Sequence, residues 1–194
     1  AAGTTPYVAG TPASTVYASP AATTTYSVTV TNTSSETRTF STGGTVTIPR
    51  VAPGSTSAGA GAPYPSTVSV SGLPANAVLK SVTVKGVKHS FPDDIDILLQ
   101  SPTGTNVVLM SDAGGSADAT GQNYTFDDAA AGLMADGALN ATGTYKPTNY
   151  GASDTYPAPV GTITQATPRL ATFSGDPNGT WYLYVSDGFG GDIG

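Results

Sequence analysis

The chain has 194 residues, of which only 10% are charged, and its formal net charge is −6. Nucleic acids and anionic membrane surfaces are bound through basic patches, so this charge balance argues against both as partners and favours a divalent cation as the charged ligand. The chain has no cysteine and no run of 18 apolar residues, so we expect neither disulfides nor insertion into a membrane.

Glycine and proline recur along most of the chain, with 24 Gly and 15 Pro, and both disfavour helix interiors. The 10 Tyr and the many Val and Thr residues favour strands instead. We therefore predict an all-β protein with almost no helix. A cysteine-free chain long enough to form a large core is typical of a bacterial extracellular protein, so we expect it to be secreted, extracellular or at the cell surface.

The first 66 residues differ in composition from the rest. Residues 1–50 predict an N-terminal arm with weak strand patterns at 26–31 and 45–48. These strands are similar to part of a bacterial Ig-like repeat, and an edge strand of the main domain is the alternative. Residues 51–66 are rich in Pro, Gly and Ser and predict a linker or long loop.

Residues 67–194 carry short strand patterns separated by turns. Alternation predicts strands near 67–70, 81–84, 95–99 and 181–185, a buried apolar run predicts one at 107–110, and a further short strand is predicted at 170–173. In the last of these, Trp181, Leu183 and Val185 share one face, and Tyr182 and Tyr184 the other. Turns are predicted at 101–104 and 176–179 from their Pro and Gly positions. Many short strands with frequent turns indicate a β-sandwich or jelly roll.

An ordered series of motifs from about residue 78 onward resembles the P/Homo B domain of kexin- and furin-type convertases and of bacterial secreted hydrolases. The matching runs are HSFPDDIDILL at 89–99, SPTGT at 101–105, FDDA at 126–129, GTYKP at 143–147, DPNGTW at 176–181, SD at 186–187 and GDIG at 191–194. The resemblance covers roughly two thirds of the chain and implies a jelly-roll β-sandwich. It also implies a non-catalytic module that stabilises or docks to a protein partner.

Two features depart from the family pattern. No catalytic domain accompanies the module in this chain, and the sequence stops at Gly194, before the last strand of the family, which carries another Trp. One explanation is a truncated chain, and the other is a strand supplied by a partner.

The sequence offers no catalytic site that we can identify. A Ser-His-Asp system needs a histidine between a hydroxyl and a carboxylate, and the single His89 lies beside no GxSxG motif. Zinc needs several His, Cys or carboxylate ligands, which one histidine and no cysteine do not supply. Paired carboxylates for glycoside hydrolysis stay open, but the aspartates lie in turn-like segments, where they also serve turn geometry.

Calcium is the ligand that the aspartates favour, because it takes 6–8 oxygen ligands in flexible geometry. Acidic clusters lie at strand ends, at 93–96, 112–118, 127–128 and 187–192, and some of them converge if the strand order follows the family. The alternative is that they are separate, solvated turn residues. The candidate ligands are Asp94, Asp127, Asp187 and Asp192, followed by Asp93 and Asp128.

Tyrosines suggest a further ligand class. Tyr124, Tyr145, Tyr150 and Tyr156 provide stacking surfaces for a surface glycan, although tyrosines in a β-sandwich more often pack with a wet hydroxyl.

Three functions therefore stay open at this point. The first is an accessory calcium-binding module that stabilises or docks to a protein partner. The second is a self-assembling subunit of an extracellular filament or surface layer, formed by strand addition at a free sheet edge. The third is the C-terminal fragment of a secreted subtilisin-like or metallo-protease.

Overall fold

A computed structural model describes residues 36–48 and 59–192 of the chain. The chain divides into two units, residues 1–38 and 39–194. Of the first unit only residues 36–38 are described, with an exposed ion pair between Arg38 and Glu36. The predicted strand at 26–31 lies outside the described residues.

The second unit is all-β, as predicted. The described residues form eleven strands and two three-residue 3-10 helices. In chain order these are β1 (Gly59–Ala60), β2 (Ser66–Val70), β3 (Val82–His89), η1 (Pro92–Asp94), β4 (Ile95–Gln100), β5 (Asn106–Ser111), β6 (Ala119–Phe126), β7 (Gly143–Tyr145), β8 (Thr148–Asn149), β9 (Ser153–Tyr156), β10 (Gly161–Thr164), η2 (Leu170–Thr172) and β11 (Gly179–Asp187).

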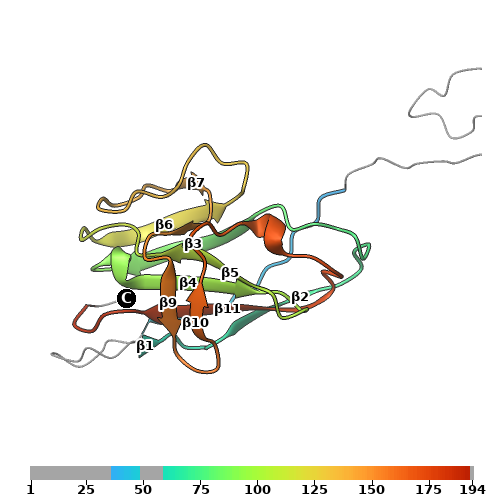
Figure 1. Ribbon diagram of the computed structural model, residues 1–194, viewed down its shortest axis with the longest axis horizontal. Helices are drawn as coiled ribbons and strands as arrows, with labels where there is room; N and C mark the ends of the chain where they lie inside the picture. Colours follow the sequence, from blue (N-terminus) through green and yellow to red (C-terminus); the bar gives the residue numbers. More distant parts are fainter. Residues whose placement is uncertain (1–35, 49–58, 193–194) are drawn as a thin grey trace, which may run out of the picture. The chain divides into compact units, whose positions relative to one another are not determined.

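The strands form two main sheets and a hairpin (Figure 1). The larger sheet has the order β1-β11-β4-β5-β8, with β2 pairing the other end of β11, and the smaller sheet has the order β3-β6-β7. In the described part of the chain, β9 and β10 pair only with each other. The predicted sandwich is confirmed, whereas its jelly-roll strand order stays a prediction.

The main core lies between the two large sheets. Alternate residues of the larger sheet, among them Ile97, Leu109 and Val185, pack with Tyr124 and Phe126 of β6. All five are at least nine-tenths buried. The predicted face of β11 is confirmed, because Trp181 and Leu183 lie in or against this core, whereas Tyr184 does not.

A second, smaller core lies on the other face of the larger sheet. Leu98, Val108 and Tyr184 pack there with Tyr156 of the β9–β10 hairpin. Because strand residues alternate between faces, each strand of the larger sheet serves both cores. This explains the nearly continuous burial of β4 and β5.

Several sequence predictions differ from the structure. Residues 45–48, predicted as a strand, form only an isolated bridge between Thr47 and Ala62. Residues 170–172 form a 3-10 helix rather than a strand, because the Asp128 carboxylate accepts hydrogen bonds from the backbone N–H groups of Leu170 and Ala171. Residues 59–66, predicted as linker, carry β1 and the start of β2. A side chain at Gly61 would overlap Val46 and the backbone of Val185, so glycine there permits close packing.

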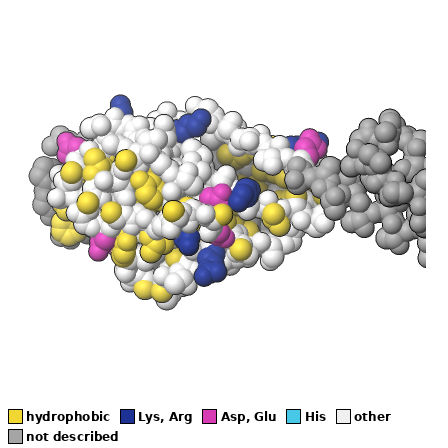
Figure 2. Space-filling view, turned by 90° about the horizontal axis from the view of Figure 1, so that it is seen from above, with side chains coloured by type: hydrophobic (Ala, Val, Ile, Leu, Met, Phe, Trp, Pro, Cys, Tyr) yellow, Lys and Arg dark blue, Asp and Glu magenta, His cyan; other side chains and the backbone are white. Residues whose placement is uncertain are grey.

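Charged side chains are sparse on the surface. Figure 2 shows acidic and basic groups scattered among larger apolar and uncharged polar areas. Within residues 36–48 and 59–192, no helix is long and apolar enough to cross a membrane.

Candidate metal centre

Antiparallel pairing of β4 with β11 brings distant aspartates to one end of the sandwich. In this register Asp96 lies opposite Ser186, and Asp187 lies opposite Ile95. η1 directly precedes β4 and carries Asp93 and Asp94. The strand pairing therefore juxtaposes acids that lie about ninety residues apart in the sequence.

A cavity of about 170 Å³ opens at this end. Its lining includes four aspartates and the turn after β11, namely Asp93, Asp94, Asp96, Asp112, Gly188 and Phe189. Asp187 and Asp192 lie close enough for their charges to act on Asp94, and Asp192 accepts a hydrogen bond from Ser90 Oγ. Four of the six predicted ligands, Asp93, Asp94, Asp187 and Asp192, are thus brought to one region.

The carboxylates around this cavity destabilise one another's charged forms. Burial, followed by the charges of Asp192 and Asp187, raises the pKa of Asp94 to about 6. Burial also raises the pKa of Asp96 to about 7, with further contributions from neighbouring aspartates and an opposing one from its hydrogen bond with Ser111. The pKa of Asp112 is raised for the same two reasons, burial and the charge of a neighbouring aspartate. Such shifts arise where like charges share a poorly solvated space.

Asp187 lies beside His89 in the protein interior. Both side chains are completely buried, and His89 Nε2 lies 3.4 Å from Asp187 Oδ2. Neither of these two atoms makes a hydrogen bond within the described part of the protein. The backbone of Phe91 fixes His89 through Nδ1, and Phe189 N–H donates to Asp187 Oδ1. One oxygen of a fully buried carboxylate is therefore left without a hydrogen-bond partner.

The donor chemistry fits calcium, while the side-chain arrangement needs adjustment. All the groups are hard oxygen donors, as calcium prefers. In the conformation described for residues 36–48 and 59–192, no three acidic, histidine or cysteine side chains converge closely enough to hold a metal ion. Side-chain rotations are therefore required before three carboxylates can share one cation.

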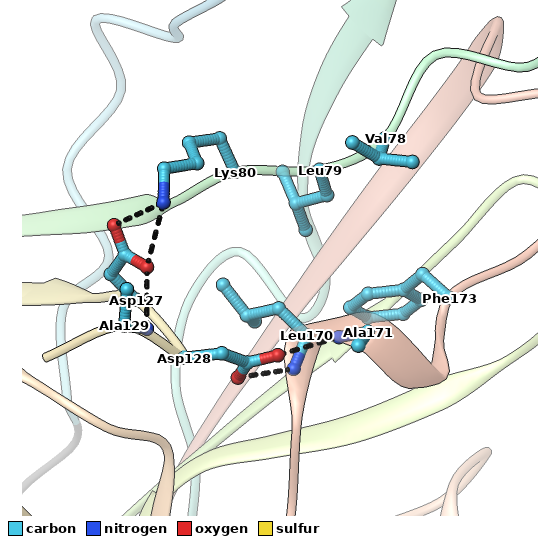
Figure 3. Close-up of a pocket in the computed structure, with 9 residues that line it drawn as sticks. All are labelled: Val78, Leu79, Lys80, Asp127, Asp128, Ala129, Leu170, Ala171 and Phe173. Carbon is cyan, nitrogen blue, oxygen red and sulfur yellow. Dashed lines mark hydrogen bonds and ion pairs between the residues drawn. The ribbon is translucent and has the colours of Figure 1, made fainter.

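The structure places Asp127 and Asp128 elsewhere, at a pocket of about 320 Å³ (Figure 3). Asp127 forms an ion pair with Lys80 at 3.2 Å and accepts a hydrogen bond from Ala129 N–H. Asp128 caps η2 by accepting hydrogen bonds from the backbone N–H groups of Leu170 and Ala171. Both carboxylates have protein partners. Neither of these two predicted ligands lines the acid-lined cavity.

Sequence reasoning placed Asp96 and Asp112 in acidic clusters but did not choose them as ligands, and it did not single out Asp154. Alternation along β4 puts Asp96 on the face opposite Ile95 and Ile97, and this is the available sequence signal. Asp154 is buried in β9 and contacts the larger sheet only because the hairpin packs on it. No local sequence pattern specifies that contact.

The four tyrosines considered for glycan stacking are anchored by packing or hydrogen bonds. Tyr124 and Tyr156 are almost completely buried. The hydroxyls of Tyr145 and Tyr150 donate to the backbone oxygens of Ala141 and Met134. Tyr150 alone of the four is notably exposed, at 42%. These positions do not form a shared stacking surface.

No protein-family model, no curated protein and no solved structure matches this chain.

Proposed function

We propose that this β-sandwich is a non-catalytic, calcium-binding module of a secreted protein, related to P/Homo B domains, which stabilises or docks to a protein partner. The observation that carries the proposal is the acid-lined cavity. Asp94, Asp96 and Asp112 line it, and the pKa of each is raised. The ion pairs of Lys and Arg among the described residues involve other acids, at Glu36 and Asp127.

A divalent cation would relieve this repulsion. Buried carboxylates without a counter-charge destabilise a fold unless they are protonated, paired or coordinated to a metal. Calcium tolerates irregular coordination, which suits the side chains of Asp94 in η1, Asp187 at the end of β11 and Asp192 after it. Its binding would join these segments at one end of the sandwich, and this would supply the stabilising role.

Thermal melting with calcium and with a chelator tests this function. If calcium reaches about 100 times its dissociation constant, a site present only in the folded state adds about 2.7 kcal/mol, which corresponds to a rise in Tm of about 5–10 °C. We expect Asp94→Asn to reduce this rise. Asp127→Asn is the matched control, because Asp127 lies at the Lys80 pocket, and it should retain the full rise. An unchanged Tm of the unmodified protein would overturn the calcium assignment.

Self-assembly by strand addition is the second candidate, and the edge position of β3 favours it. Within the described residues, this eight-residue strand pairs on one side only, with β6. Free backbone donors and acceptors at an edge can accept a strand from another chain. Size-exclusion chromatography at high protein concentration tests this candidate: concentration-dependent assembly supports it, and a stable monomer rejects it.

A further inference from the structure

A second group of acids lies deeper, between the larger sheet and the β9–β10 hairpin. Asp154 and Tyr156 alternate along β9, so both face the sheet. Opposite them are Asp96 at the start of β4 and Ser111 at the end of β5. Asp96, Ser111 and Asp154 are each less than 10% exposed.

If these carboxyl groups are all ionised, the group has too few hydrogens to satisfy them, and it needs an added proton or a cation. Ser111 Oγ lies 2.5 Å from Asp96 Oδ1 and 2.7 Å from Asp154 Oδ1. A hydroxyl has one hydrogen and can donate to only one of two ionised carboxylates. Burial, followed by the charge of Asp154, raises the pKa of Asp112, so these two carboxyl groups are also neighbours. Ser111 Oγ therefore links Asp96 to Asp154, and Asp112 lies nearby, although the three carboxyl groups share one cation only after side-chain rotation.

Tyr156 gives independent support for a ligand here. Its side chain is 2% exposed, and its hydroxyl has no hydrogen-bond partner within the described part of the protein. The hydroxyl is close enough to Asp96, Asp154 and Asp112 to interact electrostatically with each carboxyl group. A buried hydroxyl normally has a partner, so this one indicates a missing ligand beside the three acids.

Backbone conformation and hydrogen bonds fix the carboxylates of Asp112 and Asp154. Asp112 adopts a left-handed conformation, with φ of 49°, which turns its carboxylate back toward the loop after β8. There it accepts a hydrogen bond of 3.0 Å from Gly151 N–H, and a side chain at Gly151 would overlap it. Asn149 Nδ2 holds the other oxygen of Asp154 at 2.6 Å.

We propose that Asp96, Asp112 and Asp154 form a second site for a hard divalent cation, deeper than the one near Asp94, Asp187 and Asp192. The donors are carboxylate and hydroxyl oxygens, which suit calcium or magnesium rather than zinc. Asp96 and Asp112 also line the 170 Å³ cavity, which gives a cation a route of entry. On entry, the cation replaces the bridge through Ser111 as the link between the acids.

Calcium titration by calorimetry tests this site separately from the first. With both sites present, we expect two calcium ions per chain, and one in each of the variants Asp94→Asn and Asp154→Asn. Asp136→Asn changes an exposed acid and is the matched control that should still bind two. Asp112→Asn replaces Asp154→Asn if the latter does not fold.

The outcomes distinguish the two proposals. If Asp154→Asn binds one ion fewer than the unmodified protein and Asp94→Asn binds the same number, the deeper site is supported and the first site is rejected. If Asp94→Asn binds one ion fewer than the unmodified protein and Asp154→Asn binds the same number, the deeper site is rejected. No binding by the unmodified, folded protein rejects both.

Terbium luminescence gives a second measurement. Terbium replaces calcium at oxygen sites, and a nearby tyrosine sensitises its emission. In the Asp94→Asn background, we expect Tyr156→Phe to lower the emission excited through tyrosine several-fold while one terbium ion still binds. Emission that is unchanged by Tyr156→Phe, in protein confirmed as folded by circular dichroism, would overturn the placement beside Tyr156.

Discussion

Two regions of this protein contain neighbouring aspartates at strand ends, and their electrostatics are opposite. At the pocket of Figure 3, Asp127 faces Lys80 and a backbone N–H group, and the pKa of Asp127 is lowered. At the acid-lined cavity, Asp94 and Asp96 face other acids, and the pKa of each is raised. Neighbouring aspartates in a sequence therefore do not by themselves define a cation site. What decides is whether the fold supplies each carboxylate with a partner.

The largest expected difference between the regions is in pH dependence. Asp94 and Asp96 have pKa values of about 6 and 7 in the folded protein, above the ordinary value of 3.8. The folded protein therefore keeps protons that the unfolded chain releases, and the resulting stability is fully present below about pH 4 and lost as pH rises through 6 and 7. In chelator, we expect Tm to be about 5 °C higher at pH 5 than at pH 7.5.

Calcium should reverse this trend, because it competes with protons for the same carboxylates. Melting curves at several pH values, with chelator and with calcium, measure both effects. Asp96→Asn removes the more strongly shifted group and should flatten the curve in chelator. A Tm in chelator that rises from pH 5 to pH 7.5 would contradict the proposed repulsion.

The next effect concerns the other region, where a carboxylate supports the fold without a cation. Asp128→Ala removes the acceptor for the backbone N–H groups of Leu170 and Ala171, at 2.8 Å each. Loss of a comparable helix cap costs about 1–2 kcal/mol, so we expect Tm to fall by about 4 °C. The fall should be equal with calcium and with chelator. A variant that instead loses its response to calcium would place Asp128 in a cation site.

Much of the fold could be predicted from alternation along the strands. The opposite faces of β11, with Trp181 toward one core and Tyr184 toward the other, follow directly from a period of two. The turn at 101–104 is also confirmed, by a hydrogen bond from Gly104 N–H to Ser101 O. These features depend on neighbouring residues, so the local sequence contains the necessary information.

The composition of the candidate site could be predicted only in part. Asp94 and Asp187 meet because β4 pairs with β11, a long-range contact that no local pattern encodes. Asp127 follows β6 and Asp94 precedes β4, and only the fold shows that Asp127 faces Lys80 and a backbone N–H group whereas Asp94 faces other acids. Likewise, glycine at residue 61 indicated a loop, whereas its role is close contact with Val185.

The smallest expected effect is also the most specific, because it has opposite signs in the two regions. Asp96→Asn keeps an oxygen that can accept from Ser111 and removes a charge that Asp154, Asp112 and Asp94 repel. At pH 7.5 in chelator, we expect it to raise Tm by about 3 °C, on the order of 1 kcal/mol. Asp127→Asn loses an exposed ion pair with Lys80 and should lower Tm slightly, by less than about 1 kcal/mol. In calcium the first variant should become less stable than the unmodified protein, because it lacks a ligand. If both variants lower Tm in chelator, the acids of the cavity are not repelling one another, and the distinction between the two regions fails.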